Sequence, residues 1–272
     1  MRYTRLLVAG LLGLAAACSS TDNTAPGTST DDAQINGDIS AAAADGFAED
    51  INVISGMDGQ VGSTASINGG ADIMGRGGWR PGLTGCSFVG GSFNCPATLK
   101  NGLNVTRTIT FLDANSQDQT GYDSLLTASI HVLAEVSGDR TNGPWSATVD
   151  RHRDFTVTGL LGSETSRTVN GTGNETVERS RDTKNERAYD LTCSSTITDV
   201  VLPVRDDGGN GWPTAGTITR TCTINVTAGP NAGKTVTRTV TITFGGSSDV
   251  TATIGGATFT INLGTGTSSL TS

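Results

Sequence analysis

The sequence has few of the residues on which most enzymes and most nucleic-acid-binding proteins rely. It contains 2 histidines, its aromatic residues make up 5% of the chain, and its 18 Lys and Arg are outnumbered by 26 Asp and Glu. No GxSxG, HExxH or Walker-type loop occurs, so the chain offers no known pattern for a serine nucleophile, a zinc protease or a nucleotide phosphate. Nucleic acids and anionic lipids are bound through clustered Lys and Arg, and the net charge of −8 argues against both as partners.

Apolar runs long enough to span a membrane are also missing. The first one, at residues 6–14, is shorter than the roughly 20 residues that a transmembrane helix needs. It follows Arg2 and Arg5, and it is followed by three alanines at 15–17 and then by Cys18. A positive start, a short apolar run and small residues before a cleavage site are typical of a secretory signal peptide.

This segment resembles the lipobox-type signal peptide of bacterial lipoproteins, in which small residues precede a cysteine. The resemblance implies that residues 1–17 are removed, and that Cys18 becomes the first residue and carries a diacylglyceryl thioether and an amide-linked acyl chain. Several acyl chains anchor a protein stably where one chain binds only marginally. In this family an Asp after the cysteine marks retention in the inner membrane, so Ser19 implies an outer-membrane lipoprotein that faces the periplasm or the cell surface. The competing interpretation is an ordinary signal peptide with an incidental cysteine.

The resemblance ends at about residue 19, and the mature part of the chain resembles no family that can be named. Removal of Arg2 and Arg5 lowers the 18 Lys and Arg to 16 against 26 Asp and Glu, a net charge of −10. Residues 18–34 are expected to be the lipidated cysteine and a flexible tether, because a segment of Ser, Thr, Asp, Pro and Gly cannot bury enough apolar surface to fold. Residues 35–272 are expected to form a single β-rich domain.

One helix is predicted at the start of this domain, over about 38–55. Apolar residues recur there at helical spacing behind an N-cap residue, Asp38. They are Ile39, Ala43, Phe47, Ile51 and Ile54. Gly46 interrupts the pattern at a cost of about 1 kcal/mol relative to Ala. The helix is expected to pack on the apolar face of the sheet.

From about residue 86 onward, apolar residues alternate with polar ones, Thr above all, at the period of two that is typical of β-strands. Strands are predicted near 86–89, 92–95, 104–112, 125–136, 146–158, 165–179, 187–204, 216–227, 234–244, 249–254 and 257–263. Turn sequences rich in Gly, Asn and Asp separate them, among them residues 137–143. Short connections favour antiparallel neighbours. The expected fold is therefore mainly β, a long antiparallel meander sheet, flat or curled, with one N-terminal helix packed on it.

Four cysteines remain once Cys18 is assigned to the anchor, and in an oxidising compartment an even number favours disulfides over metal ligands. A two-residue turn at Gly90-Gly91 puts Cys86 opposite Cys95 at a non-hydrogen-bonded position, where Cα atoms approach to about 4.5 Å. A turn at Asp207-Gly208 likewise puts Cys193 opposite Cys222, and Pro203 opposite Trp212. The counts predict the disulfides Cys86–Cys95 and Cys193–Cys222. No metal site and no cofactor is predicted.

Arginines alternate with apolar residues on one face of several predicted strands. They are Arg107, Arg220 and Arg238 in a weakly repeated VTRT or ITRT motif, and Arg151 and Arg153 in another strand. An unpaired buried guanidinium would be very costly, so each must pair or reach the rim of the sheet. The favoured interpretation is structural, with Glu135, Asp190 or Asp199 as partners. The alternative is a cationic strip, Arg107, Arg220 and Arg238, that faces an anionic ligand.

Three further patterns carry weaker hypotheses. Asp113, Asn115, Gln117 and Asp123 offer oxygen ligands, but residues 113–123 lack the Gly and Glu of an EF-hand loop, which favours a polar hairpin loop over a Ca²⁺ site. His131 and His152 lie in predicted strands without a nucleophile pattern, which favours solvent-facing positions over general bases. Arrayed Thr is found on ice-binding surfaces, but irregular strand lengths argue against that role and Thr is favoured in strands in any case.

These observations favour a non-enzymatic cell-envelope lipoprotein of structural, adhesion or interaction type. Its expected partners are the membrane, through the lipid anchor, and an unidentified envelope protein or small ligand. One alternative is a periplasmic or outer-membrane carrier that holds an apolar or anionic ligand in a curled sheet, an architectural analogy with lipoprotein carriers built as half-barrels. A hydrolase is the second alternative.

The anchor can be tested directly. In metabolic labelling with a fatty-acid analogue, we expect the label on the wild-type chain and not on Cys18→Ser, because only the thiol of Cys18 can take the thioether. The Cys18→Ser domain should then be released without detergent. Label that persists on the variant would rule out this assignment.

Overall fold

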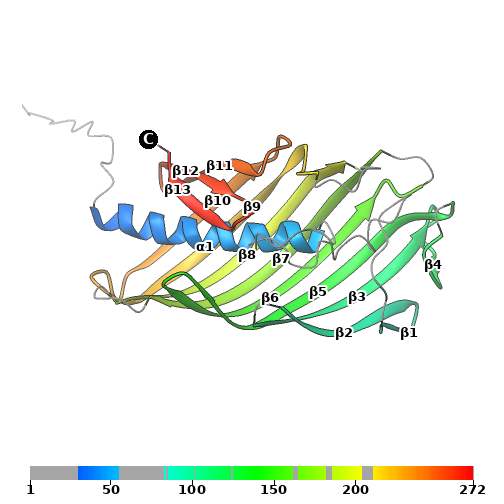
Figure 1. The fold of residues 1–272 in the computed structure, drawn as a ribbon, viewed down its shortest axis with the longest axis horizontal. Coiled ribbons are helices and arrows are strands. Elements are labelled where there is room, and N and C mark those ends of the chain that lie inside the picture. Colours follow the sequence, from blue (N-terminus) through cyan, green and yellow to red (C-terminus); the bar gives the residue numbers. More distant parts are fainter. Residues whose placement is uncertain are drawn as a thin grey trace, which may run out of the picture.

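The computed structural model describes residues 30–54, 83, 85–100, 102–123, 125–161, 165–181, 186–203 and 211–271. Within these ranges helix α1 (Thr30–Ile54) is followed by a single antiparallel sheet of 13 strands (Figure 1). The strands are β1 (Ser87–Val89), β2 (Ser92–Lys100), β3 (Leu103–Asp113), β4 (Asp118–Gln119), β5 (Thr127–Asn142), β6 (Trp145–Thr158), β7 (Ser166–Arg181), β8 (Arg187–Pro203), β9 (Ala215–Ala228), β10 (Thr235–Thr243), β11 (Asp249–Ile254), β12 (Ala257–Asn262) and β13 (Thr267–Leu270).

The sheet is a meander. Its order is β1-β2-β3-β5-β6-β7-β8-β9-β10-β11-β12-β13, with the short β4 paired to β3 outside this path. Each strand therefore pairs with the next one along the chain, apart from the detour through β4, and the sheet curls without closing (Figure 1). The predicted mainly β fold, with one helix packed on a long antiparallel meander, is confirmed for the described part of the chain.

Alternation along the strands gives the sheet two different faces. In β7 and β8 nearly every second residue is buried on the inner face, and the residues between them are exposed. One row across the inner face consists of Val149, Val177, Leu191 and Ile224, each paired with the next. On the outer face Thr follows Thr from strand to strand, and the Oγ1 atoms of Thr219 and Thr241 lie 3.0 Å apart.

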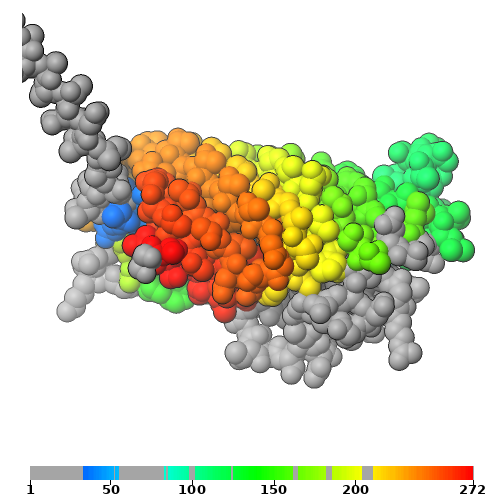
Figure 2. Space-filling view, turned by 90° about the horizontal axis from the view of Figure 1, so that it is seen from above, coloured from blue at the N-terminus to red at the C-terminus, as the bar shows by residue number. Residues whose placement is uncertain are grey.

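Helix α1 lies inside the curl. Its apolar side chains, Ile35, Ile39, Phe47 and Ile51, are buried in the core, and its backbone comes close to β11, β12 and β13. Seen from above, β10–β13 (orange to red) lie over the helix, of which only the N-terminal end (blue) is visible (Figure 2). Ser40 and Ser268 of β13 are hydrogen-bonded through their hydroxyls at 2.9 Å. No helix in the described ranges has the length and apolar character needed to cross a membrane.

Several predicted boundaries are wrong: the strand predicted at 92–95 runs on to Lys100 as β2, and two larger differences have local reasons. The helix begins at Thr30 and not at about residue 38, so residues 30–34 of the predicted tether are helical. Ile35 is completely buried, which starts the apolar stripe one turn before Ile39. Residues 137–142, predicted as a turn, continue β5 as far as the pair Asn142–Trp145. The reversal follows at Gly143, whose φ of 58° suits a left-handed turn position. β4 and β13 were not predicted.

The cysteines lie where the turn counts placed them. The Sγ atoms of Cys86 and Cys95 are 2.07 Å apart and those of Cys193 and Cys222 are 2.12 Å apart, both at disulfide-bond distance. In the first hairpin Phe88 pairs with Phe93, as predicted for a turn at residues 90–91. In the second, Cys193 pairs with Cys222, but the register shifts between Thr198 and Val201. The ladder beyond the shift is therefore displaced by one residue from the predicted pairing of Pro203 with Trp212, and the turn at 207–208 lies outside the described residues.

The two disulfides should contribute unequally to stability. Replacement of Cys193 and Cys222 by Ser should destabilise the domain by about 1 kcal/mol more than replacement of Cys86 and Cys95, because the chain-entropy cost of opening a loop grows with its length. The sequence separations are 29 and 9 residues. Urea denaturation of the two double variants checks this. Non-reducing peptide mapping should join the cysteines in these pairs, and any cross-link between the pairs would contradict the register.

Candidate functional site

Buried charge gathers on the inner face of the sheet in two neighbouring rows. The first, which we call the arginine row, takes one residue from each of β3 and β5 to β10. It is Arg107, Ala134, Arg153, Gly173, Ser195, Arg220 and Val240. Small residues separate the arginines and leave room for their long side chains. A Cβ on Gly173 would lie 2.6 Å from Cδ of Arg153, so this strand position needs glycine.

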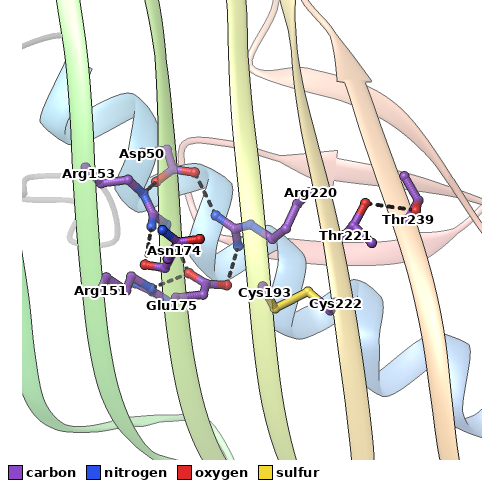
Figure 3. Close-up of a disulfide and its surroundings, with 10 residues drawn as sticks. All are labelled: Asp50, Arg151, Arg153, Asn174, Glu175, Cys193, Arg220, Thr221, Cys222 and Thr239. Carbon is purple, nitrogen blue, oxygen red and sulfur yellow. Dashed lines mark hydrogen bonds and ion pairs between the residues drawn. A yellow bond between two sulfur atoms is a disulfide. The ribbon is translucent and has the colours of Figure 1, made fainter.

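The second row, the glutamate row, lies beside the first. It is Val136, Arg151, Glu175, Cys193, Cys222 and Arg238, from β5 to β10. The disulfide lies next to Glu175 (Figure 3), with the sulfurs and a carboxylate oxygen within 4.8 Å of one another. This is the only group of three His, Cys, Asp or Glu ligand atoms found together in the described ranges, and the disulfide occupies both of its sulfurs.

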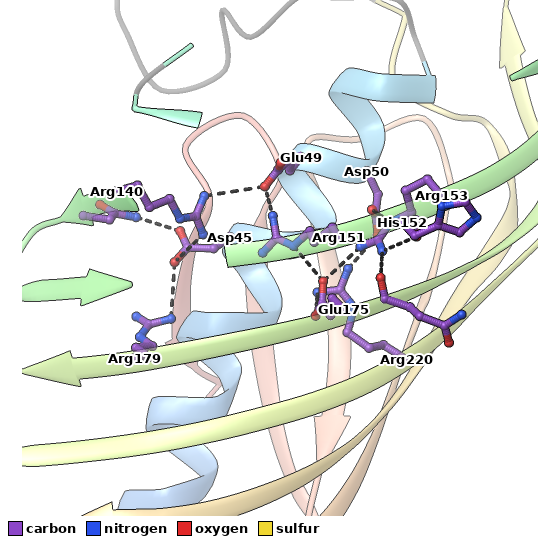
Figure 4. Close-up of polar contacts among 12 residues, drawn as sticks. Asp45, Glu49, Asp50, Arg140, Arg151, His152, Arg153, Glu175, Arg179 and Arg220 are labelled. Atoms are coloured by element: carbon purple, nitrogen blue, oxygen red, sulfur yellow. Dashed lines mark hydrogen bonds and ion pairs between the residues drawn. The ribbon is translucent and has the colours of Figure 1, made fainter. Parts of the chain in front are cut away.

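Helix α1 supplies the opposite charge. Its sequence, TDDAQINGDISAAAADGFAEDINVI, contains six acidic residues and no Lys or Arg. Four of the acids have partners on the sheet: Asp38, Asp45, Glu49 and Asp50 (Figure 4 shows the last three). Steps of seven and four residues place Asp38, Asp45 and Glu49 on one side of a helix, since 3.6 residues make a turn. The helix therefore lays a line of carboxylates against the sheet.

The centre of the site is a connected set of ion pairs, which we call the Asp50–Glu175 network: Asp50, Arg151, Arg153, Glu175 and Arg220. Asp50 accepts hydrogen bonds from Nε of Arg153 and Nη2 of Arg220, both at 2.6 Å. Glu175 accepts from Nε of Arg151 at 2.7 Å and from Nη2 of Arg153 at 3.0 Å, and its other oxygen lies 3.2 Å from Nη1 of Arg220. All five side chains are buried, and Arg220 is 1% exposed. Each carboxylate therefore bridges at least two guanidinium groups.

Gly46 explains how Arg220 reaches this position. A Cβ on Gly46 would lie 1.7 Å from Nη1 of Arg220, so any other residue would push the guanidinium away. The guanidinium also lies 4.8 Å from the ring centre of Phe47, in a cation–π contact. The glycine that weakens the helix by about 1 kcal/mol is thus the residue that lets a sheet arginine lie against the helix backbone.

The network also sets the charge states of its members. Burial alone would raise the pKa of Glu175, but Arg220, Arg151 and Arg153 outweigh it and hold that pKa well below its usual range. Burial lowers the pKa of Arg151 to about 10, although Glu175 opposes this. Burial would also lower the pKa of Arg153, but Asp50 and Glu175 raise it above the usual range. Arg151, Arg153 and Glu175 are therefore charged at neutral pH, as their ion pairs require.

A second group of contacts lies toward the N-terminal half of α1. Asp45 Oδ2 lies 3.2 Å from Arg140 and 3.3 Å from Arg179. Asp38 Oδ2 lies 2.9 Å from Arg187 and accepts a hydrogen bond of 2.5 Å from the hydroxyl of Tyr189. Burial and then this bond raise the pKa of Tyr189, and burial raises the pKa of Asp38. These contacts fix the helix at a second point along the sheet.

Glu49 joins the two groups of contacts. It pairs with Arg151 of the network and lies 3.7 Å from Arg140. Trp145 packs beneath the second group, with its ring 4.4 Å from Arg179 and 5.6 Å from Arg187. The ion pairs therefore follow the helix from Asp38 to Asp50, about half of its length.

Of the three arginines predicted as a strip, the structure brings only Arg220 into the network. Arg238 is partly buried and donates from Nε to Asn36 Oδ1 at 2.9 Å and from Nη1 to the carbonyl of Thr237. Arg107 is also partly buried, at the far end of the arginine row. The predicted partners are wrong. Glu135 contacts His152 instead, Asp199 bonds Asn170, and Asp190 is exposed, because all three lie on the outer face.

The acids of the network were not predicted from the sequence, although the sequence contains signals for them. Glu175 lies an even number of residues from Val169 and Val177 in β7, and residues at such spacing in a strand share a face, which predicts that Glu175 lies on the inner face. The helix acids stand in a 25-residue segment without a single base, which is a sign that their counter-charges lie elsewhere in the fold. Neither signal says which arginine each acid meets.

The weaker candidates lie outside the network. His131 contacts Asp154 at 2.7 Å and His152 contacts Glu135 at 2.5 Å, both partly exposed on the outer face, as the solvent-facing interpretation predicts. Asp113 Oδ1 accepts the backbone N–H groups of Asn115 and Gln117, and its pKa is lowered chiefly by the Gln117 bond. Its loop partner Asp123 accepts the N–H of Leu125. These carboxylates cap their own loop. Cys18 lies outside the described residues.

An open groove of about 590 Å³ is lined mainly by outer-face residues of β5 to β9, including Asp139, Glu178 and Asp190, and by neither histidine.

The site under the helix is an arrangement for ion pairing within the chain. In comparison with known proteins, no family model matches the sequence, and no curated protein or solved structure matches it significantly. The function has to be argued from this geometry.

The network predicts unequal effects of two arginine replacements. Arg220→Met should lower the free energy of unfolding by about 3–5 kcal/mol, because it leaves Asp50 and Glu175 buried with a partner removed. Arg238→Met should cost about 1 kcal/mol or less, because Arg238 is only partly buried and water screens its charge. Urea denaturation measures both. Asp154→Asn is the matched control, since it removes a charge from an exposed pair on the outer face.

The opposite pattern would support a ligand-binding strip. It would consist of nearly unchanged stability in both variants, with an anionic envelope glycan or lipid that raises the melting temperature of the wild type and not that of either variant.

Proposed function

We propose that this protein is a lipid-anchored cell-envelope protein of structural or interaction type, without enzymatic activity. The observation that carries the proposal is that its own helix occupies the inner face of the sheet. Phe47 and Ile51 of α1 are fully buried there, and Asp50 pairs with Arg153 and Arg220 of the arginine row. The protein therefore presents its outer face and its ends to the surroundings.

The same observation weighs against the carrier. A carrier needs an inner face that is open to its ligand, and an anionic ligand needs cations that are free to pair with it. Arg153 and Arg220 already pair with Asp50 and Glu175. Entry of a ligand would require removal of α1, which would break these pairs and expose the side chains of Phe47 and Ile51 to water.

The outer face suits a structural or interaction role. Rows of hydroxyl residues cross it, such as Thr172, Thr196, Thr219 and Thr241. Hydroxyls in adjacent strands bond one another, at 3.0 Å for Thr221 with Thr239 (Figure 3). Thr219 and Thr241 are bonded in the same way, also at 3.0 Å. The face is therefore polar and internally bonded, and cross-strand pairs of this kind stabilise a sheet. This bonding also argues against an ice-binding array, in which the hydroxyls would have to point to water.

A hydrolase receives no support from the site. Each histidine has a carboxylate partner, but both pairs lie on the open outer face, where water screens charge. The groove does not include either histidine. A general base needs a bound substrate within hydrogen-bond reach, and a concave site is the usual way to hold one.

Native mass spectrometry of the protein extracted from its host tests this function. We expect the mass of the processed chain with its acyl groups and no retained small molecule, because α1 fills the place where a ligand would lie. The Cys18→Ser protein, which lacks the acyl groups, is the control that separates covalent lipid from bound lipid. A molecule retained at one copy per chain in both proteins, and lost on unfolding, would favour the carrier.

A further inference from the structure

Large exposed apolar side chains gather at one end of the molecule. The described ranges contain six, namely Phe88, Val89, Leu125, Leu126, Leu161 and Leu270. The first five lie in or beside turns, and we call them the apolar tip. Leu125 is 78% exposed and Val89 is 63% exposed. Single exposed apolar residues are common on protein surfaces, but a cluster of them marks an interaction site.

Strand register places the five residues at the same end. Asp113, at the end of β3, pairs with Thr127, at the start of β5. Ser129 of β5 pairs with Thr158, the last residue of β6. Phe93, just after the turn between β1 and β2, pairs with Ile109 near the end of β3. The turns that hold Phe88 and Val89, Leu125 and Leu126, and Leu161 therefore share one edge of the meander, where β1 and β4 lie in Figure 1.

The hairpin of the tip that carries Phe88 and Val89 is firmly attached to the fold. The rings of Phe88, Phe93, Phe111 and Tyr122 form a chain with successive centre distances of 4.9, 5.6 and 6.0 Å. Phe111 is completely buried, so the chain connects an exposed ring to the core. The disulfide Cys86–Cys95 closes the hairpin that carries Phe88. Apolar side chains held in position lose little conformational entropy when they enter a new environment.

The chemistry of the tip favours neutral lipid. Between Arg80 and Lys100 the sequence contains no charged residue. The neighbouring loop contributes carboxylates, Asp113, Asp118 and Asp123, and no base. These acids would be repelled by an anionic headgroup surface, whereas zwitterionic headgroups tolerate them. Separate turns that each project an apolar side chain suit insertion between headgroups more than contact with a continuous protein surface.

The position of the tip relative to the anchor points to the same partner. Asp38, near the N-terminus of α1, meets Arg187 at the start of β8, which is the opposite end of the strands from the tip. The 25-residue helix is about 37 Å long. The segment from Cys18 to Thr30 can span up to about 40 Å when extended. A domain held by Cys18 at one end can thus lie along the bilayer with its other end in contact.

We propose that the apolar tip is a second membrane contact, which inserts into the headgroup region of a zwitterionic bilayer. The inference rests on the lipid anchor of the proposed function, which brings the bilayer within reach, and adds a second apolar signal to it. The anchor holds the protein at the membrane, and the tip sets its orientation there. The sheet then lies along the bilayer with much of its Thr-rich outer face in water.

The test uses the whole mature chain from Ser19 onward, made without its signal segment, so that it carries no lipid. Flotation with phosphatidylcholine vesicles should recover the wild type with the vesicles, and addition of phosphatidylglycerol should weaken binding. Leu125→Ser combined with Leu126→Ser should lower the partition coefficient at least about tenfold, the factor expected when a large aliphatic side chain no longer enters lipid. Leu270→Ser is the matched control, since Leu270 is 65% exposed at another part of the sheet.

A second readout does not depend on partition strength. Val89→Cys and Leu270→Cys, each labelled with an environment-sensitive fluorophore, should differ on vesicles, with a blue shift for position 89 alone. Circular dichroism checks that each variant is folded. Equal shifts at both positions, or no binding of the wild type, would overturn the proposal. Self-association of the wild type that is lost in the Leu125→Ser, Leu126→Ser variant would also overturn it, because the tip would then bind a second copy of the protein. A negative result in these vesicle experiments would not contradict acylation of Cys18, because acylation is measured separately by metabolic labelling in cells.

Discussion

The fold depends on ion pairs between a helix without bases and a sheet whose buried charges are mostly arginines. Asp50 of α1 reaches Arg153 and Arg220 in strands that lie on either side of β7 and β8, and Glu175 of β7 completes the set. Neither side could be buried alone, because an unpaired charge in an apolar core costs several kcal/mol. Buried ion pairs of this kind add little net stability, but they define geometry. Their partners lie along the helix from Asp38 to Asp50, so a helix displaced by one turn would leave carboxylates and guanidinium groups unmatched.

Much of this architecture could be read from local sequence. Strand alternation identified eleven of the strands, and turn counts placed both cysteine pairs, because both signals act over a few residues. The failures are non-local. Arg220 was assigned to partners such as Glu135 and Asp199, yet its partner Asp50 is 170 residues away. No periodicity carries that information. The helix start was missed because the polar composition of residues 30–34 is typical of a flexible tether. The helix includes these residues because Ile35 is buried in the core, and this burial depends on the complete fold.

Small residues are as informative in this protein as large ones. Gly46 in the helix and Gly173 in the sheet each occupy a place where a Cβ would collide with an arginine side chain. Both look like weaknesses when judged by helix or strand propensity alone. Their positions become understandable only with the arginine row in view, where Ala134 and Ser195 also keep the space between guanidinium groups open. The sizes of the residues in a row across the sheet, and not only those along one strand, thus show how side chains fill the inner face.

The bond between Ser40 and Ser268 joins residues 228 positions apart. The element that begins the described domain is thus covered by the strand that ends it, with the whole meander between them. During synthesis the acidic helix is made before the strands that cover it. The core cannot be completed until the final strands arrive, because the helix packs against β11, β12 and β13. This contact between the two ends of the described domain is non-local, and non-local contacts slow folding. Docking of the helix therefore has to wait for the last strands, which ties completion of the core to completion of synthesis.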